Sequence, residues 1–188
     1  MNWYDYREFK YFEKIEELRD IVLLEYAENK DKLDQTKNGA LVREIYNVDS
    51  DRTDVYWFGF PIIEVDNINE RYAKFWPKTS AFVKDIPGVI NTVINFVGPK
   101  SVVPRHSDTD IEKEIIGDRE AIGVIIGINM PSTDPDIVGF EVNKEIKSWG
   151  SGEIVAINGY KRHSGWNESD QWRVSMLIDL DKKYWSYD

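Results

Sequence analysis

The sequence contains no cysteine and only two histidines, and it is poor in basic residues. Without cysteine the chain can form no disulfide, thiolate metal site or cysteine nucleophile. Its 24 Lys and Arg stand against 34 Asp and Glu, which gives a formal net charge of -10. This deficit argues against nucleic-acid binding through a broad basic face, because that mode needs clustered Lys and Arg. An anionic ligand must instead find a local cationic pocket.

Long apolar runs are absent as well. No window approaches the ~18 consecutive apolar residues that a membrane-spanning helix needs, and the amino terminus carries charges where a signal peptide would be apolar. We therefore expect no membrane association and a cytoplasmic location. A length of 188 residues, with 13 % aromatic and 31 % charged residues, predicts one globular domain over residues 1–188.

Residues 1–88 are expected to form helices and strands that support the rest of the chain. Apolar residues such as Phe12, Ile15 and Leu18 recur at the three- and four-residue spacing of an amphipathic helix. Later segments are rich in β-branched and aromatic residues, which favour strands, and Pro77 suits a first helical turn. The pattern predicts, in chain order, a helix over residues 6–33, a turn over 34–40, strands over 41–46 and 54–65, and a helix from Pro77 to Ile86.

Residues 89–181 consist of short apolar runs separated by Gly, Pro, Asn and Asp. Several short strands at close spacing, with no long helical pattern between them, predict an antiparallel sandwich or small barrel. The predicted strands cover residues 89–97, 101–106, 121–130, 137–142, 153–158 and 172–180.

The stretch VVPRHSDTD places His106 directly after a β-branched run and two residues before Asp108. Alternate side chains of a strand leave the same face, about 6 to 7 Å apart, so these two could converge on one ion. His163, the other histidine, could supply a third ligand. Two imidazoles and a carboxylate leave up to three positions open, as in non-haem Fe(II) oxygenases. Taken alone, however, an H-x-D pair is more often a surface polar pair or a turn-capping Asp.

An arginine on a predicted core strand adds a second signal. Arg173 lies in the apolar run WRVSMLIDL, where a buried arginine is costly unless it pairs with an anion. Its fork of donors suits a carboxylate, and Ser175 on the same strand face would add a hydroxyl donor. The alternative is a salt bridge between Arg173 and one of the many Asp and Glu residues.

Together, the H-x-D pair, the later His and the R-x-S ending resemble Fe(II)/2-oxoglutarate-dependent oxygenases, and more narrowly the aspartyl/asparaginyl β-hydroxylase family. The resemblance covers residues 75–181. It implies a mainly β (α+β) fold, a double-stranded β-helix of the cupin-like jelly-roll type in residues 89–181, with N-terminal helices packed on one sheet. The family's spacing in the last block is matched by Trp149, Gly152, His163, Trp166, Asn167 and Arg173.

The resemblance also implies roles. Arg173 would bind the distal carboxylate of 2-oxoglutarate, with Ser175 as a further donor. Asn95 falls where the family places a hydroxyl that touches the cosubstrate, so an amide would have to take that task here. The implied Fe(II) ligands, which would form the catalytic centre, are His106, Asp108 and His163.

The sequence departs from the animal peptide hydroxylases of this family. They have Gly where Asp108 stands, whereas the related bacterial hydroxylases of free amino acids have the full triad. They also carry an Arg and a His where this chain has Gly123 and Ile125, which puts their cosubstrate contacts and acidic substrate in doubt here. Related halogenases leave the position of Asp108 without a carboxylate, so its presence implies hydroxylation.

Two arginines and one loop lie close to these residues in the sequence. Arg105 and Arg162 each precede a predicted ligand, but neighbouring strand residues face opposite ways, so solvated or structural roles are at least as well supported. The acidic segment 108–120 predicts a solvated loop, which could act as a lid when substrate enters.

The leading hypothesis is an Fe(II)- and 2-oxoglutarate-dependent dioxygenase that uses O2 to hydroxylate an unactivated carbon. Its expected substrate is a small molecule, an amino acid that is free, carrier-bound or within a short peptide. Two alternatives stay open. A metal-dependent β-barrel enzyme with non-oxidative chemistry would use the three ligands without needing Arg173 and Ser175. A non-catalytic binding module would use none of them.

Overall fold

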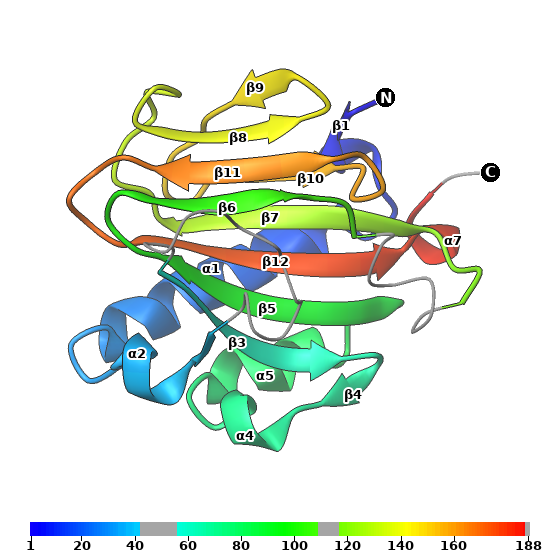
Figure 1. Cartoon of the computed structure of the whole chain (residues 1–188). Coiled ribbons are helices and arrows are strands. Elements are labelled where there is room, and N and C mark those ends of the chain that lie inside the picture. The colour runs from blue at the N-terminus through cyan, green and yellow to red at the C-terminus, as the bar shows by residue number, and fades with distance from the viewer. Residues whose placement is uncertain (42–55, 109–116, 187–188) are drawn as a thin grey trace.

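The protein is built around two antiparallel β-sheets (Figure 1). The computed structural model describes residues 1–41, 56–108 and 117–186. The large sheet has the spatial order β1 (Trp3–Tyr4), β10 (Ile154–Ile157), β7 (Ala121–Asn129), β12 (Arg173–Asp181), β5 (Val89–Val97), β3 (Trp57–Glu64) and β2 (Ala40–Leu41), with β4 (Asn67–Ile68) paired to β3. The small sheet has the order β6 (Ser101–His106), β11 (His163–Asn167), β8 (Val138–Val142) and β9 (Glu145–Lys147).

The strands from β5 to β12 pass back and forth between the two sheets. β5, β7, β10 and β12 lie side by side in the large sheet, and β6, β8, β9 and β11 form the small one. This alternation is a double-stranded β-helix, in which two sheets enclose a common interior. The predicted jelly-roll fold is therefore confirmed, and β5 and β6 have the predicted bounds.

The helices cover the face of the large sheet that is turned away from the small sheet (Figure 1). Ile15, Leu18 and Val22 of the long helix are fully buried and belong to one apolar cluster with Val124 and Met176 of the sheet. The predicted packing of N-terminal helices on one sheet is confirmed. The described helices are α1 (Phe12–Asn29), α2 (Gln35–Asn38), α4 (Glu70–Ala73), α5 (Pro77–Val83) and α7 (Lys182–Trp185), with a 3-10 turn at Tyr6–Glu8.

The N-terminal segment differs from the sequence prediction in several places, and the first helix ends at Asn29, short of the predicted residue 33. The first helix begins at Phe12 and not at Tyr6, because Tyr11 has a left-handed backbone with φ of 63°. The predicted turn over residues 34–40 contains α2, whose first N–H groups donate to the Asp34 side chain. The second helix ends at Val83, short of the predicted Ile86. Residues 42–46 and 54–55 of the predicted strands lie outside the described residues.

Several short elements were not predicted at all, namely β1, β4, β9, β11, α4 and α7. Each has two to five residues, too few for a helical or strand period to be recognised in the sequence. None of the helices among the described residues combines the length and the apolar character that a membrane crossing requires.

Candidate metal and anion site

Two strands of the small sheet place both histidines next to one carboxylate. His106 ends β6, His163 begins β11, and the two residues pair directly in the antiparallel register. Asp108 Oδ1 lies 3.7 Å from His106 Nε2 and 3.5 Å from His163 Nε2. All three ligand atoms lie within 4.8 Å of one another. Atoms that bind one ion at about 2.1 Å lie roughly 3 to 4.2 Å apart, so the two distances from Asp108 suit a single metal.

Backbone carbonyls orient both imidazoles. His106 Nδ1–H donates to Pro104 O at 2.7 Å, and His163 Nδ1–H donates to Lys161 O at 2.9 Å. A ring that donates from Nδ1 keeps its lone pair on Nε2, the nitrogen that faces Asp108. Each histidine therefore presents a ligand atom in a fixed direction.

The electrostatics keep His163 neutral. Its side chain is buried, and burial is the main reason that the pKa of His163 falls to about 4, with the nearby His106 as a second cause. At neutral pH the Nε2 of His163 thus carries a lone pair, and it lies 3.5 Å from Asp108 Oδ1. A cation would satisfy both groups, and this donor set fits Fe(II) as well as other first-row divalent metals.

The sequence predicts His106 and Asp108 on one face of an extended strand, but Asp108 lies beyond the end of that strand. β6 ends at His106, so Asp108 stands in a turn beyond the strand, where its N–H donates to Gly159 O at 3.2 Å. The carboxylate also packs against the α-carbon of Gly159, because a Cβ at that position would overlap Asp108 Oδ2. Ser107 faces the other way, and its hydroxyl donates to Tyr160 O.

Arg173 is buried without an acidic partner among the described residues. Its guanidinium lies over the rings of Phe140 and Trp149, 5.8 and 5.6 Å from their centroids, and Nη1 makes one long hydrogen bond of 3.4 Å to Gly139 O. Its Nε is buried and has no acceptor in the part of the chain that the structure describes. Burial lowers the pKa of Arg173 to about 10, so the group stays charged at neutral pH. The predicted alternative, a salt bridge to Asp or Glu, does not occur in the described part of the chain.

Two more donors stand beside Arg173. Ser175 follows it on the same face of β12, and Asn95 of β5 is the direct cross-strand partner of Ser175. Both side chains are buried. Within the described residues, neither the Ser175 hydroxyl nor the Asn95 Nδ2 has an acceptor. Three donors that line one pocket fit a bound carboxylate, because each can donate a hydrogen bond to it.

One pocket between the sheets connects the two groups. All six residues predicted for the site line it. Their roles in binding stay predictions, because geometry alone does not assign them. The sequence analysis did not identify the other lining residues, among them Trp57, Phe140, Ile157 and Leu177. The period-2 pattern of β12 could have indicated Leu177, which shares a face with Arg173 and Ser175.

The two arginines that each precede a proposed ligand lie on the surface. Arg105 is exposed and forms an ion pair of 3.2 Å with Glu141, and Arg162 is exposed as well. Residues 109–116 of the predicted lid lie outside the described residues.

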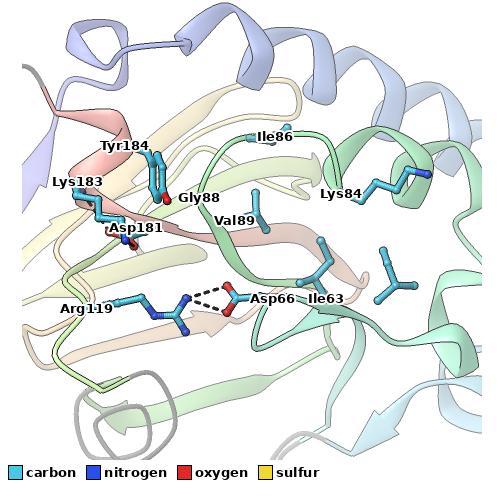
Figure 2. Close-up of a pocket in the computed structure, with 11 residues that line it drawn as sticks. Ile63, Asp66, Lys84, Ile86, Gly88, Val89, Arg119, Asp181, Lys183 and Tyr184 are labelled. Carbon is cyan, nitrogen blue, oxygen red and sulfur yellow. Dashed lines mark hydrogen bonds and ion pairs between the residues drawn. The ribbon is translucent and has the colours of Figure 1, made fainter.

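A second hollow lies at the end of the large sheet, between its strand ends and the helical side (Figure 2). Its volume is about 380 Å³, against about 60 Å³ for the pocket that contains the two histidines and Asp108. Figure 2 shows Arg119 directed at the Asp66 carboxylate, at 2.8 and 2.9 Å from its two oxygens, and Lys183 lies 3.1 Å from Asp181. The charges in each of these two pairs neutralise one another. The larger volume of this hollow therefore does not make it the better candidate for a catalytic site.

Two comparisons of the sequence found similar proteins. The family model described as aspartyl/asparaginyl beta-hydroxylase matches residues 23–183. An ornithine lipid ester-linked acyl 2-hydroxylase of Rhizobium tropici is 23% identical over 130 residues, which are 69% of this chain and 43% of that protein. The chain thus spans less than half the length of this relative.

The solved structures that match this chain include an oxidoreductase of the 2OG-Fe(II) oxygenase family from Burkholderia pseudomallei. It has a TM-score of 0.45 and 12% identity, covering 77% of this chain and 78% of that one. A cupin 2 conserved barrel domain protein from Salinispora arenicola has a TM-score of 0.40 and 11% identity, covering 73% and 89%. The family match covers most of the chain, and this protein therefore belongs to the aspartyl/asparaginyl β-hydroxylase family.

Proposed function

We propose that this protein is an Fe(II)- and 2-oxoglutarate-dependent dioxygenase that hydroxylates an unactivated carbon. One observation carries the proposal: the pocket that contains the two histidines and Asp108 also contains a buried guanidinium with no acidic partner among the described residues. A metal site for hydrolysis or isomerisation has no need of such a cation. A 2-oxoglutarate site needs it for the distal carboxylate of the cosubstrate.

The metal would be held by His106 Nε2, His163 Nε2 and one oxygen of Asp108. Three protein ligands leave positions for the keto acid and for oxygen. Bound iron and 2-oxoglutarate together supply the oxidation, in which O2 and 2-oxoglutarate convert a C–H bond to C–OH with release of succinate and carbon dioxide. Since Asp108 fills the third protein position with a carboxylate, we propose hydroxylation and not halogenation as the outcome.

The protein's own share is binding, orientation and exclusion of water. Arg173 and Ser175 would hold the distal carboxylate, and the Asn95 amide would donate to the same cosubstrate. Apolar side chains such as Ile125, Ile157 and Leu177 line the rest of the pocket. They restrict water near the metal, so that oxidation is directed to the bound substrate.

The proposed substrate is an amino acid side chain, either free, carrier-bound or in a short peptide. This part rests on likeness to the family. Succinate release measured with each of the twenty amino acids would identify a free amino acid substrate. Stimulation by none of them, with activity on a peptide or carrier-bound residue, would move the assignment to those classes.

The cosubstrate is tested without turnover. Fe(II) and 2-oxoglutarate are added to the protein in the absence of oxygen, and the weak visible charge-transfer band of the chelate is recorded. The wild type should show the band, and Arg173→Ala should lose it at equal iron content. Arg105→Ala is the matched control, because Arg105 lies one residue before a proposed ligand but pairs with Glu141 on the surface. Iron binding with no response to 2-oxoglutarate would favour a non-oxidative metal enzyme, and no metal uptake would favour a binding module.

A further inference from the structure

The indole of Trp57 contacts both halves of the proposed site. Its Nε1–H donates to Asn95 Oδ1 at 2.9 Å, and its ring centroid lies 5.9 Å from that of His106 at an interplanar angle of 39°. Trp57 is buried, lines the same pocket and comes from β3. It thus reaches the site from a strand that carries none of the other proposed residues.

An amide needs such a contact if it is to bind an anion. Asparagine has an acceptor end, Oδ1, and a donor end, Nδ2, whereas a carboxylate ligand only accepts. If Oδ1 of Asn95 faced a bound carboxylate, two acceptors would repel each other. The indole N–H of Trp57 only donates, so it holds Oδ1 and leaves Nδ2 for the ligand. Nδ2 has no acceptor among the described residues.

The strand register places Trp57 where it can do this. Trp57 pairs with Val97, which pairs with Arg173 on the other side of β5. Gly59 pairs with Asn95, which pairs with Ser175. Trp57 is therefore a diagonal neighbour of Asn95 on the face that carries Arg173, a distance that long side chains bridge. Opposite Asn95 itself, β3 has only a glycine, so the indole has room to lie across that position.

We propose that Trp57 is a positioning residue: its indole N–H fixes the Asn95 amide so that Nδ2 donates to the dicarboxylate held by Arg173 and Ser175. The inference rests on the proposed function, since 2-oxoglutarate is the dicarboxylate meant. It makes a specific prediction. Trp57 matters for cosubstrate binding only while residue 95 is an amide, because a hydroxyl can rotate to donate without being held.

A double-mutant cycle tests this dependence. The dissociation constant of 2-oxoglutarate is measured by anaerobic titration of the charge-transfer band in the wild type, Trp57→Phe, Asn95→Ser and the double variant. Trp57→Phe should raise this constant about tenfold in the wild-type background, the effect of one hydrogen bond to a charged group. In the Asn95→Ser background it should change the constant by less than about twofold.

The contact with His106 requires a separate control. Trp57→Phe changes the packing on that ring in both backgrounds, so an effect through the metal ligand would appear equally in both. Iron affinity, measured without 2-oxoglutarate, reports it directly. Equal losses of cosubstrate affinity in the two backgrounds, or no loss in either, would overturn the inference. Absence of the band in the wild type would instead overturn the proposed function.

A second variant covers the case in which Trp57→Phe does not fold. Site-specific replacement of Trp57 by 3-benzothienylalanine puts sulfur in place of the indole N–H and keeps the shape of the ring. Cosubstrate affinity should again fall about tenfold, because only the hydrogen bond to Asn95 is removed. Unchanged affinity in this variant would contradict the inference.

Discussion

Along β12, side chains alternate between two buried environments, and the two environments satisfy their residues differently. Val174, Met176 and Ile178 face the helices, are fully buried and lie in the large apolar cluster. Arg173 and Ser175 face the small sheet and are buried as well, yet in the described part of the protein no acid pairs with the guanidinium and its Nε has no acceptor. The helix-facing side supplies the free energy of folding. On the inner side, burial of the unpaired Arg173 charge costs free energy of folding, and an anionic ligand could offset this cost.

The largest effect is expected at the proposed metal ligands, which line the same pocket as the inner side of β12. Asp108→Ala removes the carboxylate that lies next to both histidines. Succinate formation should fall by about 10³-fold or more, because a bound metal contributes several kcal/mol to catalysis. The urea midpoint of the apoprotein should stay within experimental error, since Asp108 is not part of the apolar core. Asp118→Ala, at an exposed acid of the same connection, is the matched control. Wild-type turnover in Asp108→Ala would remove this residue from the site.

The helix-facing side should respond in the opposite way. Ile178→Ala opens a cavity in the apolar cluster and should lower the free energy of unfolding by about 2–5 kcal/mol. Its side chain points away from the pocket, so the affinity for 2-oxoglutarate should be unchanged at temperatures where the variant is folded. Urea unfolding and the anaerobic titration measure the two quantities. A loss of affinity without a loss of stability would show that the two faces are not separate.

Arg173→Met tests whether Arg173 lowers the stability of the apoprotein while it serves the binding of 2-oxoglutarate. A methionine of similar length removes the buried charge and should raise the free energy of unfolding of the apoprotein by about 1–3 kcal/mol. Fe(II) with 2-oxoglutarate should stabilise the wild type but not the variant beyond the effect of iron alone. The measurement is urea unfolding with and without cosubstrate, at equal iron. If the variant is less stable than the wild type and still gains stability from 2-oxoglutarate, Arg173 serves folding and not cosubstrate binding.

The sequence predicts the inner side of β12 well because alternation is a local property. The apolar run around Arg173 and Ser175 shows which side chains share a face, and β5 and β6 show the same regularity. The long helix was predicted as well, although its start depends on the backbone of Tyr11.

Other parts of the site depend on contacts between distant segments. Asp108 meets the histidines through a turn held by Gly159, and Trp57 reaches Asn95 through the register of β3 against β5. No local period contains such information. β11 has the sequence HSGWN, and its polar and small residues do not give the pattern of a strand. It forms a strand because it pairs with β6 and β8.

The smallest effect is expected from Ser175→Ala, and it distinguishes a binding hydroxyl from an ordinary core serine. If the Ser175 hydroxyl donates to the cosubstrate, its loss should raise the 2-oxoglutarate dissociation constant about three- to tenfold, as for one hydrogen bond. The apoprotein should be as stable as the wild type within about 0.5 kcal/mol, because the hydroxyl has no acceptor there to lose. Ser164→Ala, in β11 between the inward-facing His163 and Gly165, is the matched control and should change neither quantity. A variant that loses stability while keeping its cosubstrate affinity would instead place Ser175 with the residues whose burial serves folding alone.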